Sequence, residues 1–289
     1  MKKVDFFLIG APKCGTTALA ETLNMHPDVF IPDVKEPHFF CSDWPKFQRY
    51  STLDSYSSIF EVGKINGDAS VWYLYSDAAP VDIYSYNPKA KIIICLREPH
   101  KMIPSLHNQL LFSAREVEKE MKAAWCRSKS DLFKISEKRC LVHKHLDYKD
   151  VGMFYKYIKI WEEKFGRDNV EVVFLDEMVV NPESVISRVL DFLSLENVDL
   201  KLMKSNSARE HRFYWLTTLL IRPPFPLNHV KIFFRKLFKD EGRSYLRGLY
   251  SFLSKEKKGY SDTVSDEVKN EMKSYFSKDW DMVNKEYRK

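Results

Sequence analysis

The sequence predicts an α/β fold in which one parallel β-sheet is covered by helices on both faces. Short, continuous apolar runs alternate along the chain with segments of helical periodicity, the pattern of buried parallel strands and their crossover helices. The first apolar run is joined to the first helix by a loop bounded by Gly10 and Gly15. No stretch rich in glycine and serine divides the chain, so we expect one domain over residues 1–289.

Four segments are predicted to be strands. Val4–Ile9, Lys91–Leu96 and Val170–Leu175 are apolar runs rich in branched and aromatic residues. Val29–Ile31 is a shorter run of the same kind. Strands that are apolar on both faces must be covered on both sides, which is why we expect helices above and below the sheet.

Five segments carry helical spacing of apolar residues or residues typical of helix boundaries. The first follows Gly15 and is stopped by Pro27, and a later one ends at Gly166. Asn181 and Pro182 fit the N-cap and first position of another helix. The expected helices are Thr16–Met25, Ser105–Arg115, 154–165, a helix from Pro182 to Leu193, and one that begins near Asp266.

The segment from Asn206 to Tyr260 breaks the alternation of strands and helices. It holds many aromatic residues and the run Arg222–Pro226 (RPPFP), whose prolines interrupt regular structure. We expect residues 206–260 to form a lid or a specificity insertion over a binding site. The amphipathic stretch Val230–Leu237 could instead contact a membrane or a partner, and the oligomeric state is not predicted.

The composition is that of a globular protein with a mild positive charge. Hydrophobic residues make up 44% of the 289 residues and charged residues 30%, which excludes disordered and fibrous classes. The net charge of +6 suits an anionic ligand. The densest basic runs, within 231–239 and 255–258, are interrupted, so we expect no nucleic-acid partner.

The cysteines and the N-terminal residues indicate a cytoplasmic protein. Five cysteines without a CxxC pair favour a reducing compartment and argue against structural zinc. Lys2 and Lys3 precede an apolar run that is too short for the core of a signal peptide. No stretch reaches the roughly 18 apolar residues of a membrane span, so we expect no membrane contact.

The segment Gly10–Thr17 (GAPKCGTT) has the frame of a phosphate-binding loop, which makes the predicted fold P-loop NTPase-like. Its two glycines lie between a strand and a helix, so backbone N–H groups and the helix N-terminus would face an anion. In nucleotide hydrolases a lysine follows the second glycine, and a Ser or Thr then holds Mg²⁺. Here Thr16 takes the lysine position and Lys13 lies inside the loop. Asp176 is the nearest candidate for an Mg²⁺-binding aspartate.

Two segments resemble the donor-binding elements of sulfotransferases that use 3′-phosphoadenosine 5′-phosphosulfate (PAPS). Residues 6–27 (FFLIGAPKCGTTALAETLNMHP) resemble the family's 5′-phosphosulfate loop, most narrowly in its carbohydrate and bacterial branch. Residues 91–111 (KIIICLREPHKMIPSLHNQLL) resemble its 3′-phosphate element, in which Arg97 ends a strand and Ser105 lies at a helix start. A guanidinium and a hydroxyl beside helix N–H groups suit a phosphate. The alternative for Arg97 is an ion pair with Glu98.

Two weaker segments extend the resemblance over roughly residues 4–195. Lys35–Phe40 (KEPHFF) resembles the acceptor-side motif that follows the first helix. Ile65–Tyr75 (INGDASVWYLY) resembles a Gly-acid-x-Ser-Pro-x-Tyr motif, from which it departs by Val71 in place of Pro and by Asp68 in place of Glu or Lys. Direct ligand contacts are therefore not assigned to this second segment.

The resemblance implies a reaction and a donor site. The reaction is transfer of a sulfuryl group from PAPS to a hydroxyl or amine of a small-molecule or carbohydrate acceptor, with 3′-phosphoadenosine 5′-phosphate (PAP) as product and no metal required. Lys13 is expected to stabilise the leaving phosphate oxygen. The residues expected to bind the donor are Lys13, Cys14, Gly15, Thr16, Thr17, Ala18, Arg97 and Ser105.

Glu36 is the first candidate for the general base, because family members that sulfate sugars have a glutamate at the matching place. His38 is the second candidate. Glu36 could instead pair with Lys35 or Lys13, and His38 could be a packed, hydrogen-bonded residue. The other histidines that stay open as bases are His107, His143, His145 and His211.

Other interpretations of the residues also stay open. Cys14 could be a reactive thiol at a helix N-terminus or a small residue that fills space. The competing functions are a P-loop kinase or NTPase that uses Mg-ATP and a non-catalytic nucleotide-binding protein. Aromatic residues that could line an acceptor pocket are Trp44, Tyr50, Tyr56, Trp72, Tyr73 and Tyr75.

Overall fold

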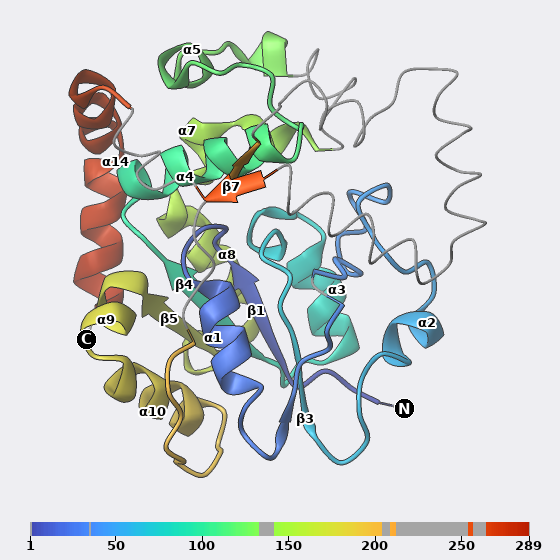
Figure 1. The fold of residues 1–289 in the computed structure, drawn as a ribbon. Coiled ribbons are helices and arrows are strands. Elements are labelled where there is room, and N and C mark those ends of the chain that lie inside the picture. Colours follow the sequence, from blue (N-terminus) through green and yellow to red (C-terminus); the bar gives the residue numbers. More distant parts are fainter. Residues whose placement is uncertain are drawn as a thin grey trace.

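The computed structural model describes residues 2–34, 36–132, 142–203 and 264–288, together with two short strands at 209–211 and 254–256. A five-stranded parallel sheet in the order β2-β3-β1-β4-β5 forms its centre (Figure 1). Strands β1 and β5 are buried along their whole length, so the predicted fold class is confirmed. The strands are β1 Phe6–Gly10, β2 Val29–Phe30, β3 Ile65–Asp68, β4 Lys91–Leu96 and β5 Val170–Phe174.

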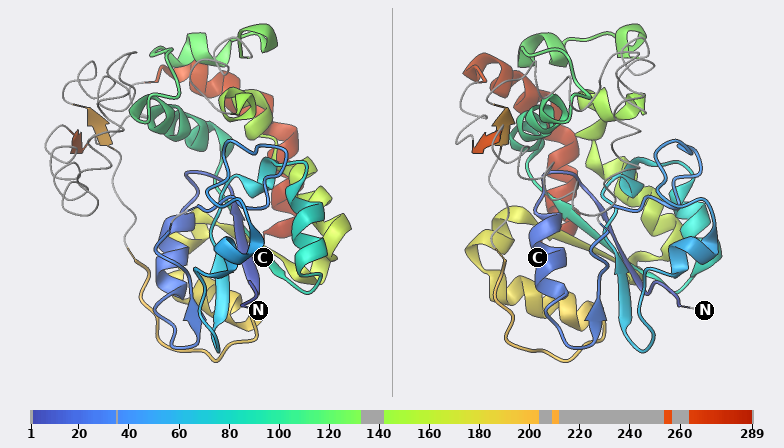
Figure 2. Two further views of the ribbon diagram at one scale, coloured as in Figure 1. Left: turned by 90° about the vertical axis from the view of Figure 1, so that its right-hand side faces the viewer. Right: turned by 45° about the vertical axis from the view of Figure 1, so that its right-hand side comes forward.

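Helices cover both faces of this sheet. In the left view of Figure 2, α1 and α10 lie on one face, and α3 and α8 lie on the other. Right-handed crossovers require this, because the chain leaves β1 toward one edge and returns across β1 from β3 to β4. Among the described residues the helices are α1 Thr16–Leu23, α2 Leu53–Ser57, α3 Ala79–Tyr86, α4 Pro99–Phe112, α5 Met121–Trp125, α7 Tyr148–Val151, α8 Phe154–Phe165, α9 Leu175–Val180, α10 Pro182–Phe192 and α14 Asp266–Tyr287, with 3-10 turns η1 Tyr73–Tyr75, η2 His143–Leu146 and η3 Arg167–Asn169.

Strand β3 was not predicted, because its sequence is polar and contains glycine. The buried Asn66 side chain accepts the N–H of Glu61 at 3.0 Å and donates to the carbonyl of Glu61 at 2.9 Å. Gly67 leaves room for the ring of Phe6, which an added Cβ would approach to 2.2 Å. The Asn66 contacts are made by a polar side chain and the Gly67 contact by a distant ring, so hydrophobic periodicity detects neither.

The helix predicted at Ser105–Arg115 begins at Pro99 instead. Proline suits the first helical position, where its missing N–H has no intrahelical partner. The later Pro104 suggests a helix boundary in the sequence but lies inside α4. Ser105 therefore lies in the second turn, and the expectation that helix-start N–H groups lie beside it is wrong.

The predicted lid falls mostly outside the described residues. Within residues 206–260 the structure describes β6 Arg209–His211 and β7 Ser254–Glu256, which pair antiparallel. Strand β6 lies beside α4. The RPPFP run and Val230–Leu237 lie outside the described residues, so the role of this segment stays a prediction.

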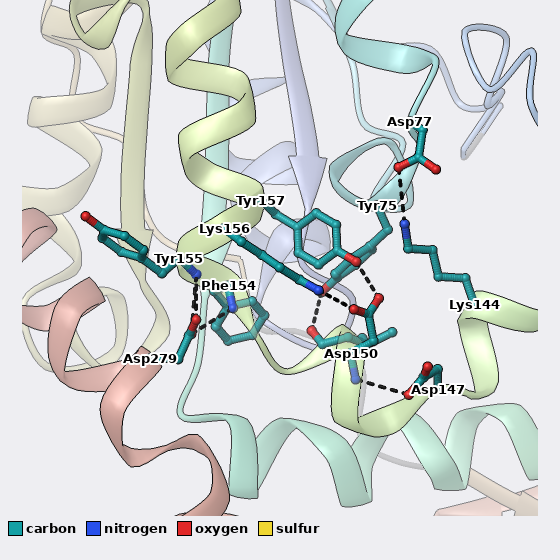
Figure 3. Close-up of polar contacts among 11 residues, drawn as sticks. Tyr75, Asp77, Lys144, Asp147, Asp150, Phe154, Tyr155, Lys156, Tyr157 and Asp279 are labelled. Carbon is teal, nitrogen blue, oxygen red and sulfur yellow. Dashed lines mark hydrogen bonds and ion pairs between the residues drawn. The ribbon is translucent and has the colours of Figure 1, made fainter. Parts of the chain in front are cut away.

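The long helix α14 is tied to α8 through a buried carboxylate. Asp279 accepts the backbone N–H of Phe154 at 2.8 Å and that of Tyr155 at 3.2 Å, so it caps the start of α8 from another element (Figure 3). The Tyr75 hydroxyl donates to the carbonyl of Val151 at 2.9 Å and holds α7 against η1.

Among the helices that the structure describes, none has the length and apolar character needed to cross a bilayer.

Candidate active site

The loop between β1 and α1 is shaped by glycine and by contact with α9. Gly15 has φ 86°, in the left-handed region that favours glycine. A Cβ at this position would lie 2.6 Å from Met178 and 2.7 Å from Leu175, both on α9. Helix α1 starts at Thr16 with no side-chain cap on its N-terminus. Its first N–H groups are therefore not taken up by a side chain at the N-cap and are available to an external acceptor.

Lys13 lies at the tip of this loop with φ 65° and is partly exposed. It has no ion-pair or hydrogen-bond partner among the described residues, so the predicted alternative of a pair with Glu36 is not observed. Burial lowers the pKa of the Lys13 ammonium below its ordinary value, and the nearby charge of Arg97 lowers it further. An anion bound between these two cations would relieve their repulsion.

Cys14 is fully buried beneath the loop. Its thiol donates to the carbonyl of Pro12 at 3.5 Å. Burial raises the pKa of this thiol to about 12, against the opposing charges of Arg97 and Lys13. A thiol with this pKa stays protonated at neutral pH, which favours the space-filling interpretation over a reactive thiolate.

Arg97 and Lys13 lie at the same end of the sheet, because they follow the carboxyl ends of β4 and β1, which are adjacent and parallel. The N–H of Ala11 donates to the carbonyl of Cys95 at 2.6 Å, which joins the ends of the two strands. The predicted alternative, an ion pair of Arg97 with Glu98, is not observed. Glu98 instead lies 3.3 Å from His100 and 3.0 Å from Lys101, and Arg97 has no ion-pair partner among the described residues.

Glu36 and His38 are bonded to each other, which the sequence analysis did not foresee. The Nε2 atom of His38 lies 3.1 Å from Oε2 of Glu36. The Glu36 side chain is 38% exposed and that of His38 only 3%, so the carboxylate faces outward and the imidazole lies behind it. Lys13, Glu36 and His38 are three of the five described non-glycine residues with positive φ. Such strained backbone is concentrated at functional sites.

The pKa of Glu36 reflects several opposing influences. Burial alone would raise the pKa of this carboxyl. The hydrogen bond from His38 and the charges of His38, Arg115 and Arg49 outweigh burial, and the pKa lies below its ordinary value. Glu36 is therefore a carboxylate at neutral pH.

A buried carboxylate at the end of β3 supports this pair from behind. Asp68 accepts hydroxyl hydrogen bonds from Ser70 at 2.6 Å, Tyr56 at 2.7 Å and Tyr73 at 3.0 Å. Ser70 in turn accepts the backbone N–H of His38 at 3.1 Å. The sequence analysis suggested that Tyr56 and Tyr73 could line an acceptor pocket. Both are instead buried in the interior, where their hydroxyl groups bind Asp68.

Two of the remaining candidates, Trp44 and Trp72, lie with Phe47 around His145, whereas Tyr50 lies against Tyr56 and Tyr75 is buried. The ring of His145 stacks on Trp72 at 3.6 Å, and the rings of Phe47 and Trp44 meet it edge-on at 4.9 and 5.5 Å. Trp72 and His145 are buried, whereas Trp44, Phe47 and Tyr50 are partly exposed. Burial holds the pKa of His145 well below its ordinary value, so this imidazole is neutral.

Two other predicted candidates are engaged elsewhere. His107 donates to the carbonyl of Glu118 at 2.8 Å and is buried, which suits a structural histidine. Asp176, the candidate Mg²⁺ ligand, receives two hydrogen bonds from Arg288, at 2.9 and 3.3 Å. The part of the chain that the structure describes contains no cluster of three side chains suited to a metal ion. The side chain of His211 lies outside the described residues.

The parallel sheet and the glycine-bounded loop between β1 and α1 define an α/β domain of the P-loop type. Within that class the chain belongs to the sulfotransferase family, because the model of the sulfotransferase domain matches residues 3–236. Carbohydrate sulfotransferase 15 from Homo sapiens is 23% identical over 72% of this chain and 47% of its own length. Heparan sulfate glucosamine 3-O-sulfotransferase 5 from Homo sapiens is 27% identical over 65% of this chain and 52% of its own length.

A solved structure agrees with this assignment. The crystal structure of a sulfotransferase from Alicyclobacillus acidocaldarius is 26% identical, with a TM-score of 0.61, over 71% of this chain and 87% of its own. The present chain spans about half the length of the curated relatives described above.

Proposed function

We propose that this protein transfers a sulfuryl group from PAPS to a hydroxyl or amine of a small-molecule or carbohydrate acceptor by in-line displacement. Family membership supports the reaction class. The observation that carries the proposal is the pair of cations Lys13 and Arg97, on the loops of adjacent parallel strands. Neither has a carboxylate partner among the described residues.

The residues present fit the donor. The uncapped start of α1 and Lys13 suit the 5′-phosphosulfate, with the backbone of Cys14, Gly15, Thr16, Thr17 and Ala18 around it. Arg97 suits the 3′-phosphate, to which Ser105 would add its hydroxyl. When bound, PAPS supplies an activated sulfuryl group and a phosphate leaving group. No divalent ion is required by this arrangement, and a bidentate ion pair already holds Asp176.

Lys13 and the N–H groups of Gly15, Thr16 and Thr17 stabilise the negative charge that develops on the leaving phosphate oxygen. Glu36 accepts the proton of the acceptor, because its carboxylate is ionised and exposed beside Lys13. His38 is a positioning residue, because its Nε2–H group donates to Oε2 of Glu36 and holds the carboxylate in place. The acceptor attacks on the side of the sulfuryl group opposite the leaving oxygen.

Ligand-dependent thermal stability tests the proposed donor. PAP without Mg²⁺ should raise the unfolding midpoint, because a ligand that binds only the native state stabilises it. A shift with Mg-ATP and none with PAP would instead support a kinase or NTPase. Binding of PAP without transfer to any acceptor of a broad panel would support a non-catalytic protein.

Arg97→Ala should weaken PAP binding by about 10²-fold, because a charge-assisted, bidentate contact with the 3′-phosphate is lost. Calorimetry with PAP and with adenosine 5′-phosphate, which lacks the 3′-phosphate, checks the location of the contact. The wild type should prefer PAP, and the variant should lose most of that preference. An unchanged preference would place the 3′-phosphate elsewhere.

Donor affinity should fall as the pH rises through the lowered pKa of Lys13. An anion beside this ammonium favours its protonated form, so binding takes up a proton once the free amine forms. The weakening should begin below the pKa of about 10.4 of an ordinary lysine. Titration of PAP binding between about pH 7 and pH 10 measures it, and Lys13→Arg, which stays charged, should flatten the curve.

We also propose a reducing, cytoplasmic location. The described cysteines Cys14, Cys41, Cys95 and Cys126 are free thiols, which supports this proposal. Mass spectrometry of thiol alkylation in cells would test it, since a disulfide on any of these residues would contradict it.

A further inference from the structure

The segment 65–75, to which no ligand contact is assigned, contains a buried carboxylate at the end of β3. The Oδ1 atom of Asp68 accepts the hydroxyl of Ser70 at 2.6 Å, and its Oδ2 atom accepts those of Tyr56 at 2.7 Å and Tyr73 at 3.0 Å. Burial raises the pKa of this carboxyl, and the three hydroxyl donors oppose the rise by stabilising the ionised form. An ionised carboxylate only accepts hydrogen bonds, so Asp68 fixes the direction of all three hydroxyl protons.

Two of these hydroxyl groups also accept backbone N–H groups of the loop between β2 and α2. Ser70 accepts the N–H of His38 at 3.1 Å, and Tyr73 accepts the N–H of Phe40 at 3.3 Å. Because both hydroxyl protons point at Asp68, the oxygen lone pairs are available to the loop. The Tyr56 hydroxyl, by contrast, bonds only to Asp68 among the described residues. Two hydrogen-bond chains therefore connect the buried carboxylate with alternate residues of the loop.

This loop needs partners of that kind. Glu36 has φ 55° and His38 φ 50°, conformations that non-glycine residues keep only where their surroundings hold them. Residues 36–40 lie outside the helices and strands. His38 and Phe40 are only 3% and 5% exposed, so protein groups must supply acceptors for their N–H groups. The hydroxyl groups of Ser70 and Tyr73 supply them.

We propose that Asp68 is a positioning residue for the general base: through Ser70 and Tyr73 it holds the loop in which His38 donates to Glu36. The inference rests on the proposed function, because it takes Glu36 as the base. Asp68 acts through the loop and touches no reacting atom. A base that moves by about 1 Å can lose about 10²-fold in rate, so the effect falls on turnover and leaves donor binding unchanged.

Two tyrosines provide a matched pair of variants. Tyr73→Phe and Tyr56→Phe each remove one hydroxyl that donates to Oδ2 of Asp68, and each keeps the buried ring. Only Tyr73→Phe removes a bond to the loop. Tyr73→Phe should lower kcat about tenfold, the effect of one buried donor left without its acceptor, whereas Tyr56→Phe should lower it less than about threefold. The Kd of PAP should be unchanged in both.

A double-mutant cycle separates positioning of the base from a general loss of structure. Single-turnover transfer of labelled sulfuryl from PAPS to an acceptor of the broad panel is measured for Ser70→Ala, Glu36→Gln and the double variant. Ser70→Ala should lower the rate about tenfold alone and add almost nothing to Glu36→Gln, because the base on which it acts is already absent. Ser70→Thr, which keeps the hydroxyl, should restore part of the rate.

The pKa of Glu36 gives a second readout that does not depend on turnover. The bond from His38 helps to lower this pKa, so weakening the loop in Ser70→Ala should raise it toward the ordinary value of about 4.3, and Tyr56→Phe should leave it unchanged. Carbon-13 NMR of glutamate-labelled protein, with Glu36→Gln to assign the signal, measures the pKa.

Three results would overturn the inference: equal losses of rate in Tyr73→Phe and Tyr56→Phe, additive losses in the cycle, or a pKa of Glu36 that does not move in Ser70→Ala. Failure of the proposed function is distinguishable, because it is read before these comparisons. It would appear as wild-type protein that does not bind PAP, or as a normal transfer rate in the single variant Glu36→Gln.

Discussion

Lys13→Ala should lower kcat by about 10²–10³-fold, the usual effect of removing one preorganised donor to a developing negative charge. Lys13 is the partly exposed cation of the loop after β1, and no described carboxylate neutralises it. Its charge is fully available to the leaving oxygen, where charge grows during transfer. PAP binding should weaken much less than turnover falls, because the backbone N–H groups at the start of α1 remain.

The measurement is a pre-steady-state transfer rate with saturating donor, together with the Kd of PAP for each variant. Lys13→Arg keeps a cation and should retain more activity than Lys13→Ala, with the remaining loss set by geometry. Lys89→Ala, which removes an exposed lysine just before β4 at the opposite end of the sheet, should behave as the wild type. If Lys13→Ala lost PAP binding and turnover by the same factor, Lys13 would bind the ground state and have no special role in the transition state.

Glu36→Gln should lower kcat by about 10²–10⁴-fold, the contribution expected of a positioned general base, and should leave PAP affinity nearly intact. Glutamine keeps the shape of the side chain and can still meet His38, so the change removes the basic oxygen without opening a cavity. A normal transfer rate in this variant would remove Glu36 from the mechanism.

The partner His38 should affect the acid side of the pH profile. The hydrogen bond from His38 helps to hold the pKa of Glu36 below its usual value, so activity should be retained down to a pH below about 4.3 wherever the fold persists. In His38→Ala this bond is lost, the pKa of Glu36 rises, and the acidic limb should move to higher pH. His38→Gln, which retains a donor, should restore part of the shift. A limb that does not move in His38→Ala would show that the imidazole has only a packing role.

Much of the fold could be predicted from local sequence because its strands are buried on both faces. Lys91–Leu96 is continuous and apolar, and the structure has β4 at those bounds. Asn181 and Pro182 start α10 as predicted, with the Asn181 side chain accepting the N–H of Ser184. β3 and the start of α4 were missed, since Asn66, Gly67 and Pro104 are unfavourable in the interior of a strand or helix. Gly67 is accommodated by a tertiary contact with the ring of Phe6.

The sequence by itself determined the parallel α/β fold, the glycine-bounded loop with Lys13, and the candidates Arg97, Glu36 and His38. The fold and the loop follow from local rules of burial and backbone conformation. Arg97, Glu36 and His38 are candidates because their segments resemble those of PAPS-dependent sulfotransferases. Only the tertiary structure decided which groups are partners. In the structure Glu36 is hydrogen-bonded to His38, Arg97 forms no ion pair with Glu98, and Asp176 is paired with Arg288. Partners of a charged group are chosen by distance in space, and residues far apart in the chain become neighbours only when the sheet and its loops have formed.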